Sequence, residues 1–369
     1  MKISVITMHA VKNYGSVLQT YATQKLLTDL GHDVEIVNYI RNKNLNSNLL
    51  KTWTKDDKGI KKKIKSLILK PTIRSWKKIF GEYLDEYINL TPYVYSSEED
   101  LINNPPIADI FCTGSDQVWN SGWNNGIEKA FYLTFVPDNI PKIAIAASIG
   151  KNKLDKEEID IILPYLRRYD YISMREISGL NIIRDMGLTN VGFCLDPTLL
   201  ISKEEWLEHA KYPPMRKKYI LVYQLNHDKE FDDYAVRLAK RKGLELYRVC
   251  TRYDQCRFSG KPIFIPKVQE LLGLINNAEF IITNSFHATI FCINLNKEFI
   301  SIYPNEYSSR ISDILDVFSL QDRHLTNYNQ YEIIDSKIDY KKVNLKLCEY
   351  RLQSINLIRN MIENSINKN

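Results

Sequence analysis

The chain is organised around residues 280–292, which read FIITNSFHATIFC. A short apolar run ends in three polar residues (283–285), and His287 lies one residue into the helical pattern that follows. This order of patterns is typical of a strand that feeds a helix in an α/β unit. At such a junction the helix N-terminus faces the carboxyl edge of the sheet, where anionic ligands bind. A histidine placed there is a candidate for proton transfer at neutral pH.

The whole chain has the composition of a soluble globular protein. It has 369 residues, of which 44% are hydrophobic and 25% charged, and a formal charge of +6, so two domains are expected. The first residues, Met1 to Thr7, resemble a strand and not a signal peptide, and the sequence contains no run of about 18 apolar residues. We therefore expect a cytoplasmic protein, which is either free in the cytoplasm or peripherally bound to the inner face of the membrane.

Six cysteines are scattered through the sequence without a Cys-x-x-Cys pair and without neighbouring histidines. Several lie in apolar patterns, where free cysteine is usually a small core residue. We expect neither a disulfide framework nor a metal site.

Strand and helix patterns alternate along the chain. The N-terminal β-loop-α-β pattern over residues 2–39 is Rossmann-like, but its loop lacks the Gly-x-Gly-x-x-Gly fingerprint. NAD and FAD are therefore disfavoured, and no cofactor is expected. A second α/β series begins at Tyr219. The alternation predicts parallel sheets covered by helices on both faces, in two Rossmann-like domains with an active site in the cleft between them.

The domain boundaries follow from changes in composition. We expect an N-terminal domain over 1–205, with a Lys/Asn-rich helical insertion at about 41–105, and a C-terminal domain over 206–340. Residues 341–369 are predicted to form an amphipathic helix that packs back on the N-terminal domain.

The insertion contains a strongly basic segment. Residues 58–78 hold nine basic residues and no acidic one, with apolar residues at helical spacing. Such a helix can bind an anionic membrane surface or a polyanionic acceptor. The alternative is a solvated helix in a lysine-rich chain. A nucleic-acid partner is disfavoured, because the segment lacks interleaved aromatic residues and a known binding fold.

Polar residues follow five of the predicted strands at their carboxyl ends, where ligands of doubly wound domains bind. The five clusters are Asn13-Tyr14-Gly15-Ser16 with Gln19, Gly114-Ser115-Asp116-Gln117 with Trp119 and Asn120, Ser173 with Arg175 and Glu176, Asp196, and Thr283-Asn284-Ser285 with His287.

Each cluster has a functional and a structural interpretation. Asp116 and Gln117 can orient sugar hydroxyls and Trp119 can stack on a sugar, or the three belong to a turn and the core. Arg175 can clamp a carboxylate or phosphate, or pair with Glu176 or another neighbour.

The remaining candidates have the same ambiguity. Asp196 can simply cap a turn. His287 is either a catalytic group or a buried histidine bonded to a carbonyl. Two further histidines, His9 and His324, lie in predicted loops, and either is a candidate second participant.

Taken together and in order, five sequence strings resemble the polysaccharide pyruvyl transferase family over about residues 1–318. They are Asn13-Tyr14-Gly15-Ser16-Val17-Leu18-Gln19, Gly114-Ser115-Asp116-Gln117-Val118-Trp119-Asn120, Ser173-Met174-Arg175-Glu176, Asp196-Pro197-Thr198 and Ser285-Phe286-His287.

The resemblance implies a GT-B-like fold and the transfer of pyruvate from phosphoenolpyruvate to sugar hydroxyls, commonly as a ketal. It implies a saccharide acceptor in a cell-surface polysaccharide or its lipid-linked precursor, for example one carried on undecaprenyl. The family histidine corresponds to His287, and a donor-binding arginine corresponds to Arg175. We assign Asn284 and Ser285 to the donor as well, and the acceptor to a second set, Asp116, Gln117, Trp119, Asn13 and Gln19.

The chain departs from the family pattern at one position. Many members have an arginine two residues before the histidine, where this chain has Ser285. Arg310 is our candidate replacement for that positive charge. Two rival functions stay open: a glycosyltransferase that uses a nucleotide sugar in the same cleft, and a non-catalytic scaffold of polysaccharide assembly.

Overall fold

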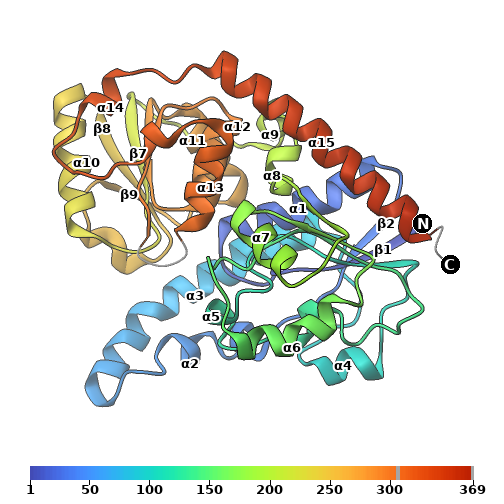
Figure 1. Cartoon of the computed structure of the whole chain (residues 1–369). Coiled ribbons are helices and arrows are strands. Elements are labelled where there is room, and N and C mark those ends of the chain that lie inside the picture. The colour runs from blue at the N-terminus through green and yellow to red at the C-terminus, as the bar shows by residue number, and fades with distance from the viewer. Residues whose placement is uncertain (305–307, 367–369) are drawn as a thin grey trace. The chain divides into compact units, whose positions relative to one another are not determined.

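The computed structural model describes residues 1–304 and 308–366. The chain divides into two compact units, each described by itself. Unit 1 comprises Met1–Leu45, Leu84–Ile201 and Lys346–Asn369, and unit 2 comprises Asn46–Tyr83 and Ser202–Leu345. Each unit has one parallel sheet with helices (Figure 1). The prediction of two Rossmann-like α/β folds with parallel sheets is confirmed.

Unit 1 has a six-stranded sheet in the order β2-β1-β3-β4-β5-β6, and every neighbouring pair is parallel. The order reverses between β1 and β3, which is where ligands bind in sheets of this kind. The strands are β1 (Lys2–Ile6), β2 (Asp33–Ile36), β3 (Ile110–Thr113), β4 (Lys142–Ala147), β5 (Tyr171–Met174) and β6 (Val191–Phe193).

The helices of unit 1 connect these strands. They are α1 (Tyr14–Asp29), η1 (Asn42–Asn44), α4 (Glu98–Asn103), α5 (Ser121–Asn124), η2 (Lys129–Tyr132), α6 (Lys156–Leu166), α7 (Ile177–Asp185) and α8 (Pro197–Leu200), where η marks a 3₁₀ helix. All residues of β3 and β4 are buried, as expected for parallel strands covered on both faces.

Unit 2 has a five-stranded parallel sheet in the order β11-β10-β7-β8-β9. Numbered from its own first strand, this is the Rossmann order, and its reversal lies between β7 and β10. The strands are β7 (Tyr219–Tyr223), β8 (Glu245–Cys250), β9 (Lys261–Phe264), β10 (Phe280–Thr283) and β11 (Phe299–Ser301).

Helices cover both faces of this second sheet. In Figure 1, α10 lies on one side of the strands, and α11, α12 and α13 lie on the other. The helices of unit 2 are α2 (Leu49–Trp53), α9 (Lys203–His209), α10 (Lys229–Lys242), η3 (Tyr253–Arg257), α11 (Val268–Asn277), α12 (Phe286–Asn294), α13 (Ser309–Phe318), η4 (Gln321–Arg323) and α14 (Glu332–Asp335).

The long helix α3 (Gly59–Tyr87) belongs to unit 2 up to Tyr83. The indole N–H of Trp76 donates to the carbonyl of Thr251 at 2.7 Å, and the backbone N–H of Tyr253 donates to the Thr72 hydroxyl at 3.2 Å. Residues 46–83 therefore group with the second unit, whereas the sequence suggested an insertion in the N-terminal domain. The difference arises because the helix is hydrogen-bonded to Thr251 and Tyr253, which follow β8 in unit 2.

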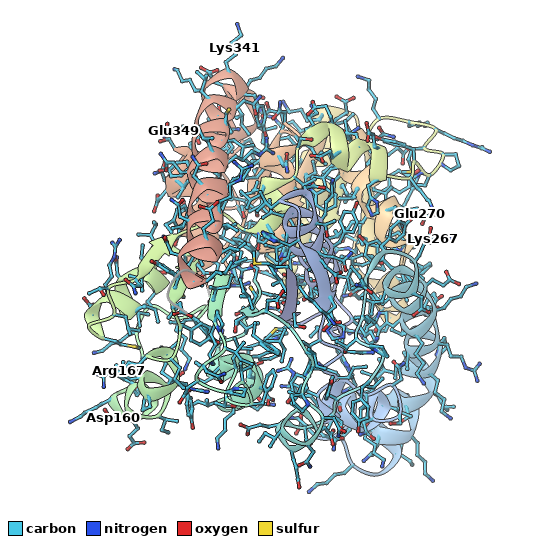
Figure 2. All side chains as sticks on the ribbon, turned by 90° about the vertical axis from the view of Figure 1, so that its right-hand side faces the viewer. Asp160, Arg167, Lys267, Glu270, Lys341 and Glu349 are labelled. Atoms are coloured by element: carbon cyan, nitrogen blue, oxygen red, sulfur yellow. The ribbon has the colours of Figure 1, made fainter. Side chains whose placement is uncertain are left out.

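The last helix, α15 (Tyr340–Ile366), belongs to unit 1 from Lys346 onward. The Arg351 side chain donates to the carbonyls of Leu199 and Ile201 at 2.5 and 3.0 Å. The Glu349 side chain of this helix projects away from the ribbon in Figure 2. No helix within the described residues is long and apolar enough to cross a membrane.

Candidate active site

In unit 1 the predicted polar clusters meet where the strand order reverses. The hydroxyl of Ser16, after β1, donates to the carboxylate of Asp116, after β3, at 2.6 Å. Beside it, the Thr7 hydroxyl donates to the Ser115 carbonyl at 2.8 Å. Asp116 adopts a left-handed backbone conformation with φ 75°, which Asp tolerates better than most residues. These contacts hold the two loops together.

The same loop carries a second polar pair, Gln117 and Asn120, which lies so close to Gly150 that a side chain at position 150 would not fit. The Asn120 amide donates to the Gln117 side-chain oxygen at 2.7 Å. Both groups contact Gly150, where a Cβ would lie 2.6 Å from Asn120 Nδ2 and 2.7 Å from Gln117 Oε1. Gly150 has φ +64°, so an alanine there would meet both backbone strain and a steric conflict.

We expect Gly150→Ala to lower the free energy of unfolding by at least about 1 kcal/mol more than Gly31→Ala, as measured by urea denaturation. Gly31→Ala is a matched control, because Gly31 has φ +91° and no neighbour within 4 Å of the added Cβ. It therefore isolates the backbone strain, which is about 1–2 kcal/mol. Equal effects of the two substitutions would show that Gln117 and Asn120 are not held against Gly150.

Arg175 lies at the end of β5 within a cluster of carboxylates. Its guanidinium is 2.9 Å from Asp196, 3.1 Å from Glu176 and 3.9 Å from Asp116, and its side chain is fully buried. Burial alone would lower the pKa of Arg175, but the carboxylates of Glu176, Asp196 and Asp116 together raise it. The guanidinium therefore stays charged and balances the acidic groups around it.

The carboxylates of this cluster are held by hydroxyl donors as well. Ser115 donates to Asp196 at 3.0 Å, and Ser148 donates to Glu176 at 2.7 Å. Asp196 also caps α8 through the backbone N–H of Thr198. Arg175 thus forms ion pairs and Asp196 caps a helix, as their structural interpretations predict. The buried guanidinium of Arg175 exposes no face to a donor molecule.

Trp119 does not have the exposed face that sugar stacking requires. Its indole is 1% exposed, stacks on Tyr132 at 5.5 Å and donates to the Phe131 carbonyl at 3.0 Å. The sequence interpretation of Trp119 as an acceptor-binding residue is therefore corrected to a core residue. The apolar pattern around it, with its polar tip satisfied internally, explains its burial.

The two remaining acceptor candidates of unit 1 lie at the start of α1. Asn13 caps this helix by accepting from the Gly15 N–H at 2.8 Å. Gln19 is completely buried and donates to the Thr7 hydroxyl at 2.9 Å. Gln19 thus holds the loop after β1 through Thr7, whereas Asn13 is partly exposed.

In unit 2 the side chain of Asn284 links the two loops at the reversal of strand order. Its oxygen accepts from the backbone N–H of Leu225 at 2.8 Å, and its amide donates to the Asn226 carbonyl at 3.0 Å. The neighbouring Thr283 hydroxyl donates to the Tyr223 carbonyl at 2.6 Å. The polar run identified in the sequence thus joins the end of β10 to the end of β7.

The first turn of α12 carries the other candidates of unit 2. Ser285 caps the helix and accepts from the Ala288 N–H at 3.4 Å. His287 lies in the first turn with 8% exposure. Its ring is 5.3 Å from that of Phe286, over which the Arg310 guanidinium lies at 5.8 Å. A positive charge from α13 is therefore close to the helix start that bears the histidine.

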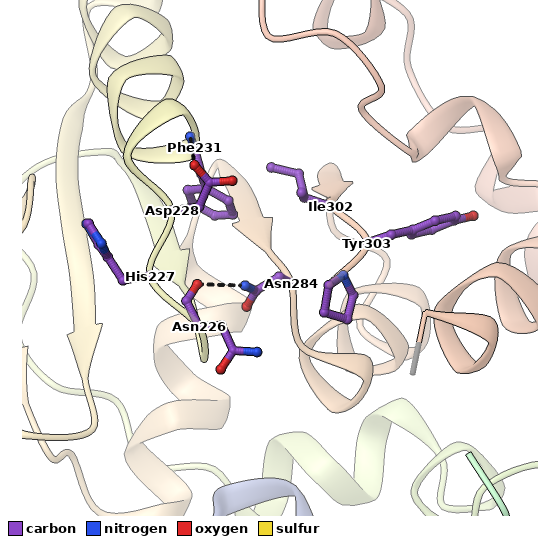
Figure 3. Close-up of a pocket in the computed structure, with 8 residues that line it drawn as sticks. Asn226, His227, Asp228, Phe231, Asn284, Ile302 and Tyr303 are labelled. Atoms are coloured by element: carbon purple, nitrogen blue, oxygen red, sulfur yellow. Dashed lines mark hydrogen bonds between the residues drawn. The ribbon is translucent and has the colours of Figure 1, made fainter. Parts of the chain in front are cut away.

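A cavity of about 290 Å³ opens at this edge of the unit 2 sheet (Figure 3). Its walls combine residues after β7, β10 and β11, and Figure 3 shows the hydrogen bond from the Asn284 amide to the Asn226 carbonyl. The lining residues are Asn226, His227, Asp228, Phe231, Asn284, Ile302, Tyr303 and Pro304.

Sequence reasoning missed most of this lining. Asn226, His227 and Asp228 lie three to five residues after the end of β7, so the rule that identified the other clusters would have identified them as well. Tyr303 follows β11 and stacks on His324, with ring centroids 3.3 Å apart. No local pattern indicates this pair, because its two residues lie on different loops.

The two other histidines considered from sequence lie in different units. Burial lowers the pKa of His9 to about 4, and its Nε2 is 3.3 Å from Asn38 Oδ1 in unit 1. Burial also lowers the pKa of His324, whose Nδ1 is 3.2 Å from the Ser301 carbonyl in unit 2. Both shifts favour the neutral form of the ring. Within the described residues, no group of three His, Cys, Asp or Glu side chains could hold a metal.

The two sheets and their reversal points define a protein with the GT-B fold. Three solved structures are similar over nearly their whole length. MnaA from S. aureus with UDP has 13% identity, covers 98% of this chain and 97% of its own, and gives a TM-score of 0.56. The UDP-GlcNAc 2-epimerase of Methanocaldococcus jannaschii with UDP-GlcNAc and UDP has 15% identity, 94% and 93% coverage, and a TM-score of 0.53.

The third is a glycosyltransferase of Streptomyces sp. SF2575 with thymidine diphosphate, at 9% identity, 98% and 99% coverage, and a TM-score of 0.50. At these identities the likeness shows the fold alone. The model of the polysaccharide pyruvyl transferase family matches residues 13–306. The chain therefore belongs to this family, and its class is that of a transferase acting on polysaccharide. Among curated proteins there is no match.

Proposed function

We propose that the protein transfers pyruvate from phosphoenolpyruvate to hydroxyls of a saccharide and forms a pyruvate ketal. The family match over residues 13–306 carries this proposal. The side chains at the carboxyl edge of the unit 2 sheet support it, because they combine a histidine with a neighbouring cation. The acceptor is a sugar of a cell-surface polysaccharide or of its lipid-linked precursor, for example on undecaprenyl.

The donor in this proposal binds at the carboxyl edge of unit 2. Phosphoenolpyruvate carries a carboxylate and a phosphate, which require cations or helix N-termini. Arg310 supplies the positive charge that Ser285 lacks, and the start of α12 supplies N–H groups and the positive end of the helix dipole. Asn284 holds the adjacent loops in place through Leu225 and Asn226. Of the residues assigned to the donor, Asn284 lines the cavity of about 290 Å³, whereas Ser285, His287 and Arg310 are not among its lining residues.

The chemistry requires one proton relay. A sugar hydroxyl adds to C2 of the donor and loses its proton, while C3 gains a proton and becomes a methyl group. The C2–O bond to phosphate then breaks, a second hydroxyl adds to C2, and its proton leaves with the phosphate. His287 is assigned the relay of these protons, a role that typically contributes about 10²- to 10⁴-fold in rate.

The acceptor is assigned to the polar edge of unit 1. Asp116 and Gln117 follow β3 and are 5% and 6% exposed, and Asn13 lies partly exposed in the loop between β1 and α1. In this proposal Asp116 and Gln117 accept from or donate to sugar hydroxyls. Arg175 and Gln19, both buried, position these loops and do not contact the acceptor.

Two measurements on the intact protein test the proposed function. Thermal-shift titration should give a higher Tm with phosphoenolpyruvate than with UDP or GDP sugars, because only the preferred ligand stabilises the folded state at low concentration. Mass spectrometry of lipid-linked sugars incubated with phosphoenolpyruvate should then show a gain of pyruvic acid less one water. Stabilisation by a nucleotide sugar alone would favour a glycosyltransferase, and no stabilisation by either donor would favour a scaffold.

A further inference from the structure

The N-terminal half of α3 exposes an apolar stripe. Ile60, Ile64, Leu67 and Ile68 are 77%, 54%, 65% and 46% exposed. Their spacing places them on one face of the helix. At 3.6 residues per turn, this face lies opposite the buried side chains of Leu69, Ile73, Trp76 and Phe80. The helix therefore uses one face to pack within unit 2 and turns a second apolar face to the solvent.

Basic side chains flank this stripe on both sides. Lys61 lies on one side of it, and Lys63, Lys70 and Arg74 lie on the other, all exposed. Asp57 precedes the helix and pairs with Lys65 at 2.6 Å, but residues 58–78 contain no acidic residue. The exposed face is thus apolar at its centre and positively charged at its borders.

We propose that α3 binds in the plane of an anionic lipid bilayer, with this apolar stripe in the headgroup and acyl boundary. An interfacial helix buries its apolar face while flanking lysines extend toward anionic headgroups. The charge complementarity requires an anionic partner, and the apolar stripe requires a hydrocarbon one. A soluble polyanion would satisfy the lysines and leave four large apolar side chains in water. An anionic bilayer provides both the negative charge and the hydrocarbon. This binding does not depend on the transfer reaction.

Co-sedimentation of the full chain with lipid vesicles tests this proposal. We expect binding to phosphatidylcholine vesicles that contain phosphatidylglycerol, weak binding to phosphatidylcholine alone, and loss of binding at high salt. Ile64→Ser with Leu67→Ser should lower the partition coefficient by roughly tenfold or more. Lys63→Gln with Lys70→Gln should lower it by roughly tenfold or more as well.

Matched control variants separate this face from general surface effects. Leu345 and Leu352 of α15 are 72% and 62% exposed, and Leu345→Ser with Leu352→Ser should leave binding unchanged. The exposed pair Lys217 and Lys218 provides the equivalent control for charge through Lys217→Gln with Lys218→Gln. Circular dichroism of each variant checks that α3 remains folded.

Three outcomes would overturn the proposal. The first is equal binding to neutral and anionic vesicles, or equal binding by wild type and both α3 variants. The second is tight binding to a soluble polyanion such as polyphosphate that Ile64→Ser with Leu67→Ser does not weaken. The third is self-association in light scattering that the same variant abolishes, without vesicle binding, which would assign the stripe to a second copy of the chain.

Discussion

We expect His287→Gln to lower kcat for the proposed pyruvyl transfer by roughly 10²- to 10⁴-fold, because the variant loses the group assigned to proton relay. Glutamine keeps a polar side chain of similar length at the start of α12 but does not exchange a proton near neutral pH. KM for phosphoenolpyruvate should change little, because Arg310 and the helix N-terminus are retained. Phosphate release and product mass measure the rate, and urea denaturation checks the stability of the variant.

The control is His32→Gln, a histidine of unit 1 that lies between α1 and β2. It should leave both kcat and KM at the wild-type values. Near-wild-type transfer by His287→Gln would remove the catalytic assignment while leaving the proposed function intact. If the wild type itself showed no phosphoenolpyruvate-dependent product, the proposed function would fail, whatever the variant does.

Arg175→Met lowers the free energy of unfolding by about 3–5 kcal/mol, because removing one partner leaves buried charges uncompensated. The guanidinium is fully buried against Asp196, Glu176 and Asp116. Methionine fills part of the volume, so the loss comes from the carboxylates that lose their counter-charge. Urea denaturation of the two proteins at pH 7 measures the difference.

A surface ion pair provides the comparison. Lys25 and Asp29 of α1 are 2.9 Å apart and partly exposed, so Lys25→Met should cost at most about 0.5 kcal/mol. Adding Asp196→Asn to Arg175→Met should recover part of the lost stability, because the substitution removes one buried charge and asparagine still caps α8. If the only role of Arg175 were to bind the donor, the Arg175→Met variant would have the same urea midpoint of unfolding as the wild type and would lose only transfer activity.

The sequence predicts the strands and helices of the fold and the polar residues that follow several strands at their carboxyl ends. Apolar runs such as 280–283 and 219–223 are followed by polar turns and helical patterns, and this local order requires strand-helix units. The order of the strands in each sheet cannot be predicted from these local patterns. That β10 lies beside β7 and β1 beside β3 depends on pairings between segments far apart in the chain.

The candidate residues show the same division. The sequence placed Asn284 and Asp116 after strands and His287 at a helix start, and the structure has them there. It could not decide between the two interpretations of Arg175, because the deciding partner is Asp196, 21 residues away. It also assigned Trp119 to a sugar, although Tyr132 and the Phe131 carbonyl bury it. In each case the burial of a side chain depends on residues that its local pattern does not contain.

The run at 280–292 by itself determined that a histidine lies at the start of a helix after a buried strand. Backbone propensity and periodicity act over a few residues, so a single sequence is sufficient to indicate such a junction. Only the tertiary structure decided that Asn284 links this junction to the loop after β7 and that Arg310 lies over Phe286 beside His287. These contacts bring together residues from separate strands and helices, and their distances follow from the packing of the whole unit.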